Sequence, residues 1–334
     1  MEPGLYVLVP VGLGGAEGEL ASPIPLIDGV ELASFDPAWK DEVRHLLELV
    51  RKDHSDCSDH DLEQFEKTRH CLLLRFGDPD GGRPIEPEVY DQGELDIRAR
   101  ARPTYGLAKR WLRSLGVLVI AGRIHFGCFP HWFGFRAGQS PELPLNCYKA
   151  IKVGWYGRFV DDEKREAADD EYRRRVGMIV RTLARCPDES RPAVAADMFA
   201  RAEFADDWRV AMLFYWVALE ALFGQAEAEL SHQLCERAAV LITSPGEDRL
   251  KVYRGLRDAY GFRSKLVHGG LRHPMDQDRQ RLSAVIDLVE DGARRALCRV
   301  LTDRDMTKLF LQKDRAIKDY FEKAVLTPHW ACHA

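Results

Sequence analysis

The chain has 334 residues, of which 46% are hydrophobic and 30% are charged, a composition that excludes a largely disordered protein. Its formal net charge of −5 excludes a protein that is basic throughout, although it leaves room for a local basic surface. A chain of this length predicts two domains or one large one.

Nothing in the sequence predicts secretion or membrane insertion. The first residues, MEPGLYVLVPVGLGG, lack a basic segment, and Pro10 interrupts their apolar run. The longest uncharged apolar stretches fall well short of the roughly 20 residues that a membrane helix needs. We therefore expect a cytoplasmic protein with no membrane partner, in which the eight cysteines are reduced and contribute mainly to the core.

Three groups of histidine and cysteine have spacings that suggest zinc ligands. These groups are His54/Cys57/His60, His125/Cys128/His131 and His329/Cys332/His333. Zinc sites generally use two closely spaced pairs that converge tetrahedrally, and none of the three groups matches a standard finger or ribbon. We expect no metal site, and a zinc enzyme built on these groups is the least favoured alternative.

The first half of the chain mixes strand and helix signals. Residues 5–11 and 71–76 are short apolar runs typical of strands, and residues 39–52 have the spacing of an amphipathic helix. Residues 116–126 (GVLVIAGRIHF) predict another buried strand. We expect residues 1–190 to form a mixed α+β domain, to which the residues themselves assign no chemistry.

The second half predicts long helices with short connections. The segment 186–192 (CPDESRP) breaks the pattern and marks the expected domain boundary. After it, Asp206 or Asp207 can cap an apolar helix that runs to Phe223 and is stopped by Gly224 at its C′ position. Further helices are expected over 227–243, 247–267 and 276–301. The fold class is therefore α+β, with an antiparallel helical bundle over 191–326 and a tail over 327–334.

A basic segment lies within this bundle. Residues 249–272 hold seven cations and one acid, Asp258, a net charge of +6 in an acidic protein. The cations are Arg249, Lys251, Arg254, Arg257, Arg263, Lys265 and Arg272. A solvated helix face usually mixes both signs, so this segment favours contact with phosphate or RNA.

At the end of the basic segment the sequence reads YGFRSKLVHGG over residues 260–270. Arg263 and His268 form an R-x4-H pattern, which is the only R-x4–6-H pattern in the chain. The pattern alone has little specificity, but here a double glycine follows the histidine and an apolar helix ending WVALEALFG (216–224) precedes the segment.

These two segments, with the amphipathic helix that follows, resemble the HEPN domain superfamily and within it the Apea-like HEPN group of bacterial proteins. The resemblance covers roughly residues 195–325 and implies an antiparallel helical bundle that forms homodimers. Many members are metal-independent endoribonucleases of phage defence, toxin–antitoxin and RNA-processing systems, so it implies RNA as partner and no cofactor. The first domain would then sense a regulatory partner or phage-derived trigger, or select the substrate.

Carried over by motif position, Arg263 and His268 are the implied catalytic residues. The residues expected to bind RNA phosphates are Ser264, Lys265, Arg257, Arg254 and Arg272, and those expected to support the site structurally are Glu220 and Tyr260. The sequence departs from the family pattern at Ser264, because active members commonly carry Asn, Asp or His after the arginine. This departure leaves a catalytically inactive module that binds RNA, nucleotide or a protein as the alternative.

The expected reaction is cleavage of single-stranded RNA by its own 2′-OH, which leaves a 2′,3′-cyclic phosphate and a 5′-OH. Histidine is the side chain whose ordinary titration lies nearest to neutral pH, so His268 can transfer the proton. Arg263 can donate paired hydrogen bonds to the oxygens that gain charge. On a straight helix five residues turn the two about 140° apart. Either the helix unwinds near Gly269 or a dimer assembles the site.

Purely structural roles remain open for both residues. His268 can cap the end of its helix, where a cation is favoured. Arg263 can pair with Glu220, since a lone carboxylate on an apolar helix needs a cation.

Overall fold

The computed structural model describes the chain in segments and divides it into two compact units. The described residues are 4–14, 23–26, 30–34, 40–41, 44, 65–66, 69–76, 113–122, 125–128, 131–137, 146–149, 156–158, 169–203, 205, 207–224, 230–244, 246–269 and 276–326. Unit 1 comprises residues 1–114 and 123–173, and unit 2 comprises residues 115–122 and 174–334. The division differs from the expected boundary near 190, because the segment 186–192 only connects two helices of unit 2.

Unit 1 contains one antiparallel sheet centred on β1 (Gly4–Gly14). One edge of β1 pairs with β4 (His70–Phe76), which continues to β3 (Val30–Ser34) and β2 (Ile24–Pro25). The sheet confirms the strands expected over 5–11 and 71–76.

The other edge of β1 has two partners. β6 (His131–Ala137) pairs with its first half and β5 (His125–Cys128) with its last four residues. β7 (Asn146–Lys149) extends the sheet beyond β6, and β8 (Tyr156–Arg158) extends it beyond β5. Phe129 and Pro130 separate β5 from β6.

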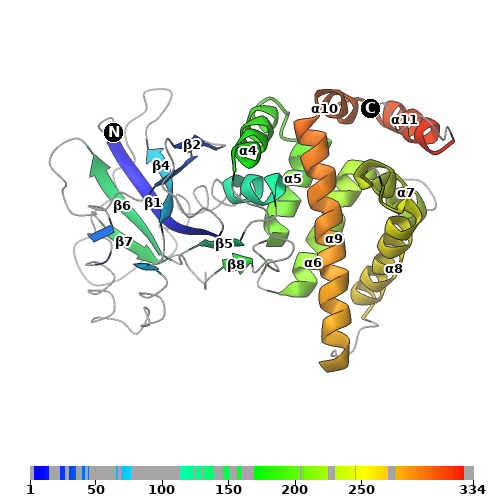
Figure 1. The fold of residues 1–334 in the computed structure, drawn as a ribbon, viewed down its shortest axis with the longest axis horizontal. Coiled ribbons are helices and arrows are strands. Elements are labelled where there is room, and N and C mark those ends of the chain that lie inside the picture. Colours follow the sequence, from blue (N-terminus) through cyan, green and yellow to red (C-terminus); the bar gives the residue numbers. More distant parts are fainter. Residues whose placement is uncertain are drawn as a thin grey trace. The chain divides into compact units, whose positions relative to one another are not determined.

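Unit 2 is helical, as the sequence predicts for the second half (Figure 1). Its helices are α4 (Asp170–Leu183, which begins just before the unit), α5 (Arg191–Glu203), α6 (Trp208–Phe223), α7 (Leu230–Ile242), α8 (Arg249–Val267), α9 (Asp276–Thr302), α10 (Arg304–Phe310) and α11 (Asp314–Leu326). The long α9 packs against α5, α6, α7, α8 and α10, and therefore forms the centre of the bundle (Figure 1).

Residues 113–121 are helical, which corrects the strand expected over 116–126. Residues 114–122 are all buried, so the segment has no polar face to reveal a helical period. A short apolar run of this kind cannot be assigned to strand or helix by periodicity. A Cβ placed on Gly116 would lie 2.7 Å from Cβ of Ala200, so the missing side chain allows this helix to approach α5 closely. Among the described residues of the expected strand, only 125 and 126 lie in a strand, β5.

The start of α6 agrees with the sequence-based prediction, and its end agrees only in part. Asp207 caps the start of α6, because its side chain accepts a hydrogen bond of 2.7 Å from the Arg209 N–H. Gly224 ends the helix, but its φ of −66° is not the left-handed conformation expected at a C′ glycine. Glycine is required there for space, since a Cβ would lie 2.5 Å from the Glu220 carbonyl oxygen.

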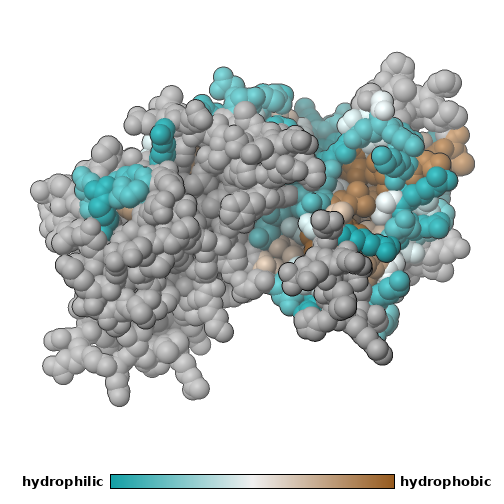
Figure 2. All heavy atoms as spheres, turned by 60° about the horizontal axis from the view of Figure 1, so that its bottom comes forward, coloured by the Kyte–Doolittle hydropathy of each residue, from teal (hydrophilic) through white to brown (hydrophobic). Residues whose placement is uncertain are grey.

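Aromatic rings join the C-terminal helices to the core. Phe223 at the end of α6 meets Phe310 of α10 and Phe321 of α11, with ring centroids 5.7 and 5.8 Å apart. All three side chains are at most 2% exposed. On the face drawn in Figure 2, hydrophilic side chains surround smaller apolar areas on the described helices.

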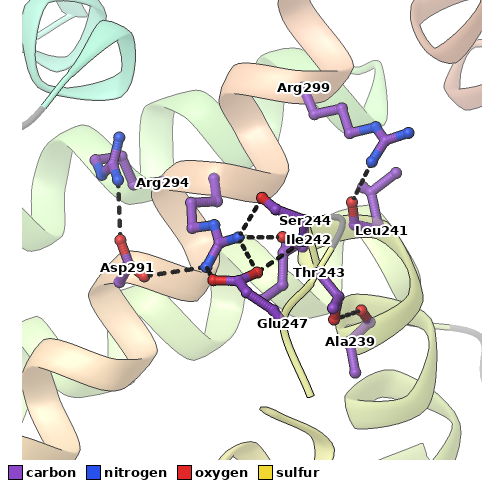
Figure 3. A network of polar contacts seen from close by, with 10 residues as sticks. Ala239, Leu241, Ile242, Thr243, Ser244, Glu247, Asp291, Arg294 and Arg299 are labelled. Carbon is purple, nitrogen blue, oxygen red and sulfur yellow. Dashed lines mark hydrogen bonds and ion pairs between the residues drawn. The ribbon is translucent and has the colours of Figure 1, made fainter. Parts of the chain in front are cut away.

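Arginines of α9 hold the connection between α7 and α8 (Figure 3). Arg295 donates hydrogen bonds to both carboxylate oxygens of Glu247, at 3.1 and 2.6 Å, and also to Ser244 Oγ and the Ile242 carbonyl. Arg299 donates to the Leu241 carbonyl at 2.9 Å. These bonds satisfy carbonyl groups that the end of α7 leaves without helical partners. The start of α8 is therefore fixed against α9.

Candidate functional site

The R-x4-H motif lies at the end of α8, whose start is capped by Asp248. The Asp248 side chain accepts hydrogen bonds of 2.9 and 3.2 Å from the N–H groups of Leu250 and Lys251. The helix continues to Val267, and the His268 N–H still donates to the Ser264 carbonyl at 3.1 Å. Gly269 follows with a φ of +72°, which a glycine adopts without strain. His268 is therefore the last residue in helical register, and its side chain is exposed.

Arg263 forms an ion pair with Glu220 of α6. Its Nη2 atom lies 3.1 Å from Glu220 Oε1, and the two side chains are only 25% and 22% exposed. The Arg263 guanidinium carbon lies 5.4 Å from the centroid of the Tyr260 ring, one turn earlier on α8. Tyr260 in turn packs edge-on against Trp216 of α6, with centroids 5.1 Å apart. Four residues from two helices thus form one cluster, to which both residues expected to support the site, Glu220 and Tyr260, belong.

The polar groups of this cluster are incompletely satisfied. Glu220 Oε1 is in ionic contact with Arg263 without the alignment of a hydrogen bond, and the buried Arg263 Nε and Trp216 Nε1 make no hydrogen bond to other described residues. Burial raises the pKa of Glu220, and the positive charge of Arg263 opposes that rise. The charge of Arg263 therefore favours the ionised form of the carboxylate.

Arg263 and His268 do not meet within one chain. No hydrogen bond or ion pair joins them in the described part of the bundle, and Arg263 is directed to Glu220 while His268 is exposed. The unbroken helical register up to His268 keeps the five-residue separation at about 140° around the axis. Unwinding of the helix ahead of the histidine does not occur.

Several of the expected phosphate-binding residues share the outer face of α8. Arg254, Arg257 and Lys265 are exposed, and Ser264 is half-buried. Arg272 lies outside the described residues. Lys251, one turn before Arg254, is also exposed. We call Lys251, Arg254, Arg257 and Lys265 the cation row.

Sequence reasoning missed Trp216 and Lys251 as members of the site. Trp216 lies four residues before Glu220, so helical spacing places both on one side of α6. Lys251 lies three residues before Arg254 and could have been found by the same rule.

The residues His54, Cys57, His60, His329, Cys332 and His333 lie outside the described residues. His125 and Cys128 lie on β5, and His131 begins β6. Among the described residues, no three His, Cys, Asp or Glu side chains gather as metal ligands would. In the same residues, no helix combines the length and hydrophobicity needed to cross a membrane.

Comparison of the chain with models of protein families, with curated proteins and with solved structures gives no match.

Proposed function

We propose that this protein is a metal-independent endoribonuclease that cleaves single-stranded RNA at a site assembled from two chains. The observation that carries the proposal is the arrangement on α8, where a fixed Arg263, an exposed His268 and a row of exposed cations occur on one helix. Arginine, histidine and exposed cations are the groups that metal-free phosphodiester cleavage requires. The resemblance of residues 195–325 to the Apea-like HEPN group supports the same reaction.

In this reaction the RNA supplies its own nucleophile. The 2′-oxygen forms a bond to phosphorus while the bond from phosphorus to the 5′-oxygen breaks. A histidine accepts the proton of the 2′-OH, and a proton is returned to the departing 5′-oxygen. The products are a 2′,3′-cyclic phosphate and a 5′-OH. His268 is exposed and can reach a bound strand, so it takes the role of the proton-transfer group.

Arg263 stabilises the negative charge that develops on the non-bridging phosphate oxygens. A guanidinium has five N–H donors, and its Nη2 atom lies 3.1 Å from Glu220 Oε1. Glu220 and the Tyr260 ring limit the orientations of Arg263, so that less freedom is lost when a phosphate binds.

Two chains are needed because one chain directs the two residues apart. A two-fold axis beside the ends of two α8 helices would bring His268 of one chain toward Arg263 of the other. Exposed Val217 on α6 and Val267 on α8 provide apolar surface near the motif for such an interface. The first unit would sense a trigger or select the substrate, in phage defence or in a toxin system, as the resemblance implies.

The alternative is a bundle that binds RNA without cleaving it. The observation that favours it is the ion pair itself, since Arg263 already has a partner in Glu220. Ser264 also occupies the position where active relatives carry Asn, Asp or His. This alternative predicts salt-dependent RNA binding with no turnover.

The test incubates the full-length protein with end-labelled single-stranded RNA in EDTA and resolves the products. The variants are His268→Ala and Arg263→Ala, and their matched controls are His232→Ala and Arg315→Ala at exposed positions of α7 and α11. The proposal predicts cleavage by the wild type and both controls, and loss of at least about 100-fold in both site variants. Undiminished cleavage by both site variants would refute the site, and binding without cleavage by the wild type would favour the alternative.

A further inference from the structure

Five exposed residues of α8 and the exposed His268 that follows it form one continuous stripe along the helix. Lys251, Arg254, Asp258, Gly261, Lys265 and His268 follow one another at intervals of three or four residues, and all are exposed. Arg257 lies beside this stripe, above the Tyr253 ring at 5.9 Å. At 100° per residue this spacing keeps one face of a helix in line. Arg263 falls on the opposite side of the helix, against Glu220.

The stripe carries mainly positive charge, extends over most of α8 and ends at His268. The charged side chains exposed along α8 are the four members of the cation row and a single acid, Asp258. Seventeen residues separate Lys251 from His268, which corresponds to about 25 Å of helix. One end of the stripe is the exposed histidine to which the proposed function assigns proton transfer.

Gly261 leaves a gap in the middle of the stripe. A Cβ placed on it would have no atom within 4 Å, so the surface there is open and any side chain fits the fold. The absence of a side chain permits close approach of a phosphate backbone between Arg257 and Lys265. It also provides a position where charge can be added to the stripe without removing any existing contact.

We infer that the outer face of α8 is a track for the backbone of single-stranded RNA, and that the track ends at the phosphate beside His268. A single row of cations on a convex helix follows one strand. The only aromatic side chains of α8, Tyr253, Tyr260 and Phe262, are half-buried, so the track has no exposed ring on which bases can stack. Recognition along the track is therefore by phosphate and independent of sequence. The identification of the bound strand as RNA rests on the proposed function.

The test measures binding of a strand that cannot be cleaved, so that its result is separate from that of the cleavage assay. A fluorescent single-stranded 2′-deoxy oligonucleotide of about twelve residues lacks the nucleophile yet carries the same phosphates. Fluorescence anisotropy at low salt compares the full-length wild type with Gly261→Lys and Gly261→Glu. Gln312→Lys and Gln312→Glu, at an exposed position between α10 and α11, make the same changes of net charge outside α8.

The track predicts that Gly261→Lys tightens binding about fivefold and that Gly261→Glu weakens it about fivefold, while both Gln312 variants stay within about twofold of the wild type. The logarithm of the wild-type affinity should fall against the logarithm of salt concentration with a slope of about −3, for four cations on a single strand. The inference is overturned if both Gly261 variants bind like the wild type, if the Gln312 variants shift affinity equally, or if a duplex of the same length binds more tightly than the single strand.

Discussion

The Nη2 atom of Arg263 lies 3.1 Å from Oε1 of Glu220, and this contact connects the end of α8 to the apolar helix α6. The two residues are 43 positions apart in the chain, so the pair depends on the packing of the bundle. Each charge is less than one-third exposed, and each therefore relies on the other for part of its stabilisation.

Removal of Arg263 should destabilise the bundle, and removal of its partner should restore most of the loss. Arg263→Gln leaves an ionised carboxylate partly buried without a cation, which costs about 1–3 kcal/mol of unfolding free energy at neutral pH. The double variant Arg263→Gln/Glu220→Gln has no buried charge and should be more stable than Arg263→Gln alone. Urea denaturation of the four proteins of this cycle measures the coupling. Equal stability of Arg263→Gln and the double variant would show that the two residues are not coupled.

The same pair gives stability a pH dependence of defined sign. Burial raises the pKa of Glu220 above its ordinary value of 4.5, so the folded state holds this proton more tightly than the unfolded state. The contribution of Glu220 to stability is therefore full below about pH 4.5 and is lost as pH rises through its folded pKa. Arg263→Gln removes the charge that opposes the rise, so its stability should fall more steeply between pH 4.5 and neutrality. Urea denaturation at a series of pH values measures this. If the free energy of unfolding of Arg263→Gln falls with pH no more steeply than that of the wild type, the pH dependence does not come from Glu220.

Glu247 should show the opposite dependence. Hydrogen bonds from Arg295 lower the pKa of Glu247, so its contribution to stability is present above about pH 4.5 and is lost as pH falls through its folded pKa. Arg295→Ala should remove this acid-sensitive part and cost about 1–2 kcal/mol at neutral pH, because several hydrogen bonds to the α7–α8 connection disappear.

Denaturation of Arg295→Ala at a series of pH values below neutrality checks this expectation. Arg315→Ala, at an exposed position of α11, serves as the control and should leave the acid limb unchanged. An identical acid limb in Arg295→Ala and the wild type would show that the ion pair does not contribute.

Two glycines should respond in opposite ways to the same substitution. Gly116→Ala places a Cβ 2.7 Å from Cβ of Ala200 and should destabilise unit 2 by about 1–3 kcal/mol through overpacking. Gly261→Ala meets no atom within 4 Å and should stabilise α8 by about 0.5–1 kcal/mol, since alanine is the better helix former. Thermal unfolding measures the stability of the two variants. A lower stability of Gly261→Ala together with an unchanged stability of Gly116→Ala would contradict this prediction.

Local sequence signals were sufficient for α6, α7, α8 and α9. Asp207 was one of two predicted caps of α6, and the amphipathic pattern predicted α9, because caps and helical periods depend on neighbouring residues. The segment 113–121 was misassigned because its buried residues carry no periodic signal. The bonds of Arg295 to the α7–α8 connection could not be predicted. An arginine on a charged helix is expected to be solvated, and its partner Glu247 lies 48 residues away in the sequence.

The candidate site was also predicted only in part from the sequence. Arg263, Glu220 and Tyr260 were predicted and Trp216 was not, and pairing of Arg263 with Glu220 was one of two open roles for the arginine. Sequence could not decide between these roles, because the choice depends on how α6 and α8 pack. The structure shows the pair in place.

The composite site is tested most directly by mixing the two inactive variants. Arg263→Ala retains His268, and His268→Ala retains Arg263, so a mixed dimer contains one complete site. When equal amounts of the two variants are mixed and exchange subunits freely, the mixture should regain about one quarter of wild-type RNA cleavage in EDTA. About half of the dimers are then mixed, and each mixed dimer has one complete site of the two. Recovery to that level is the predicted result. A mixture that stays as inactive as the separate variants, beside an active wild type, would contradict a site assembled from two chains.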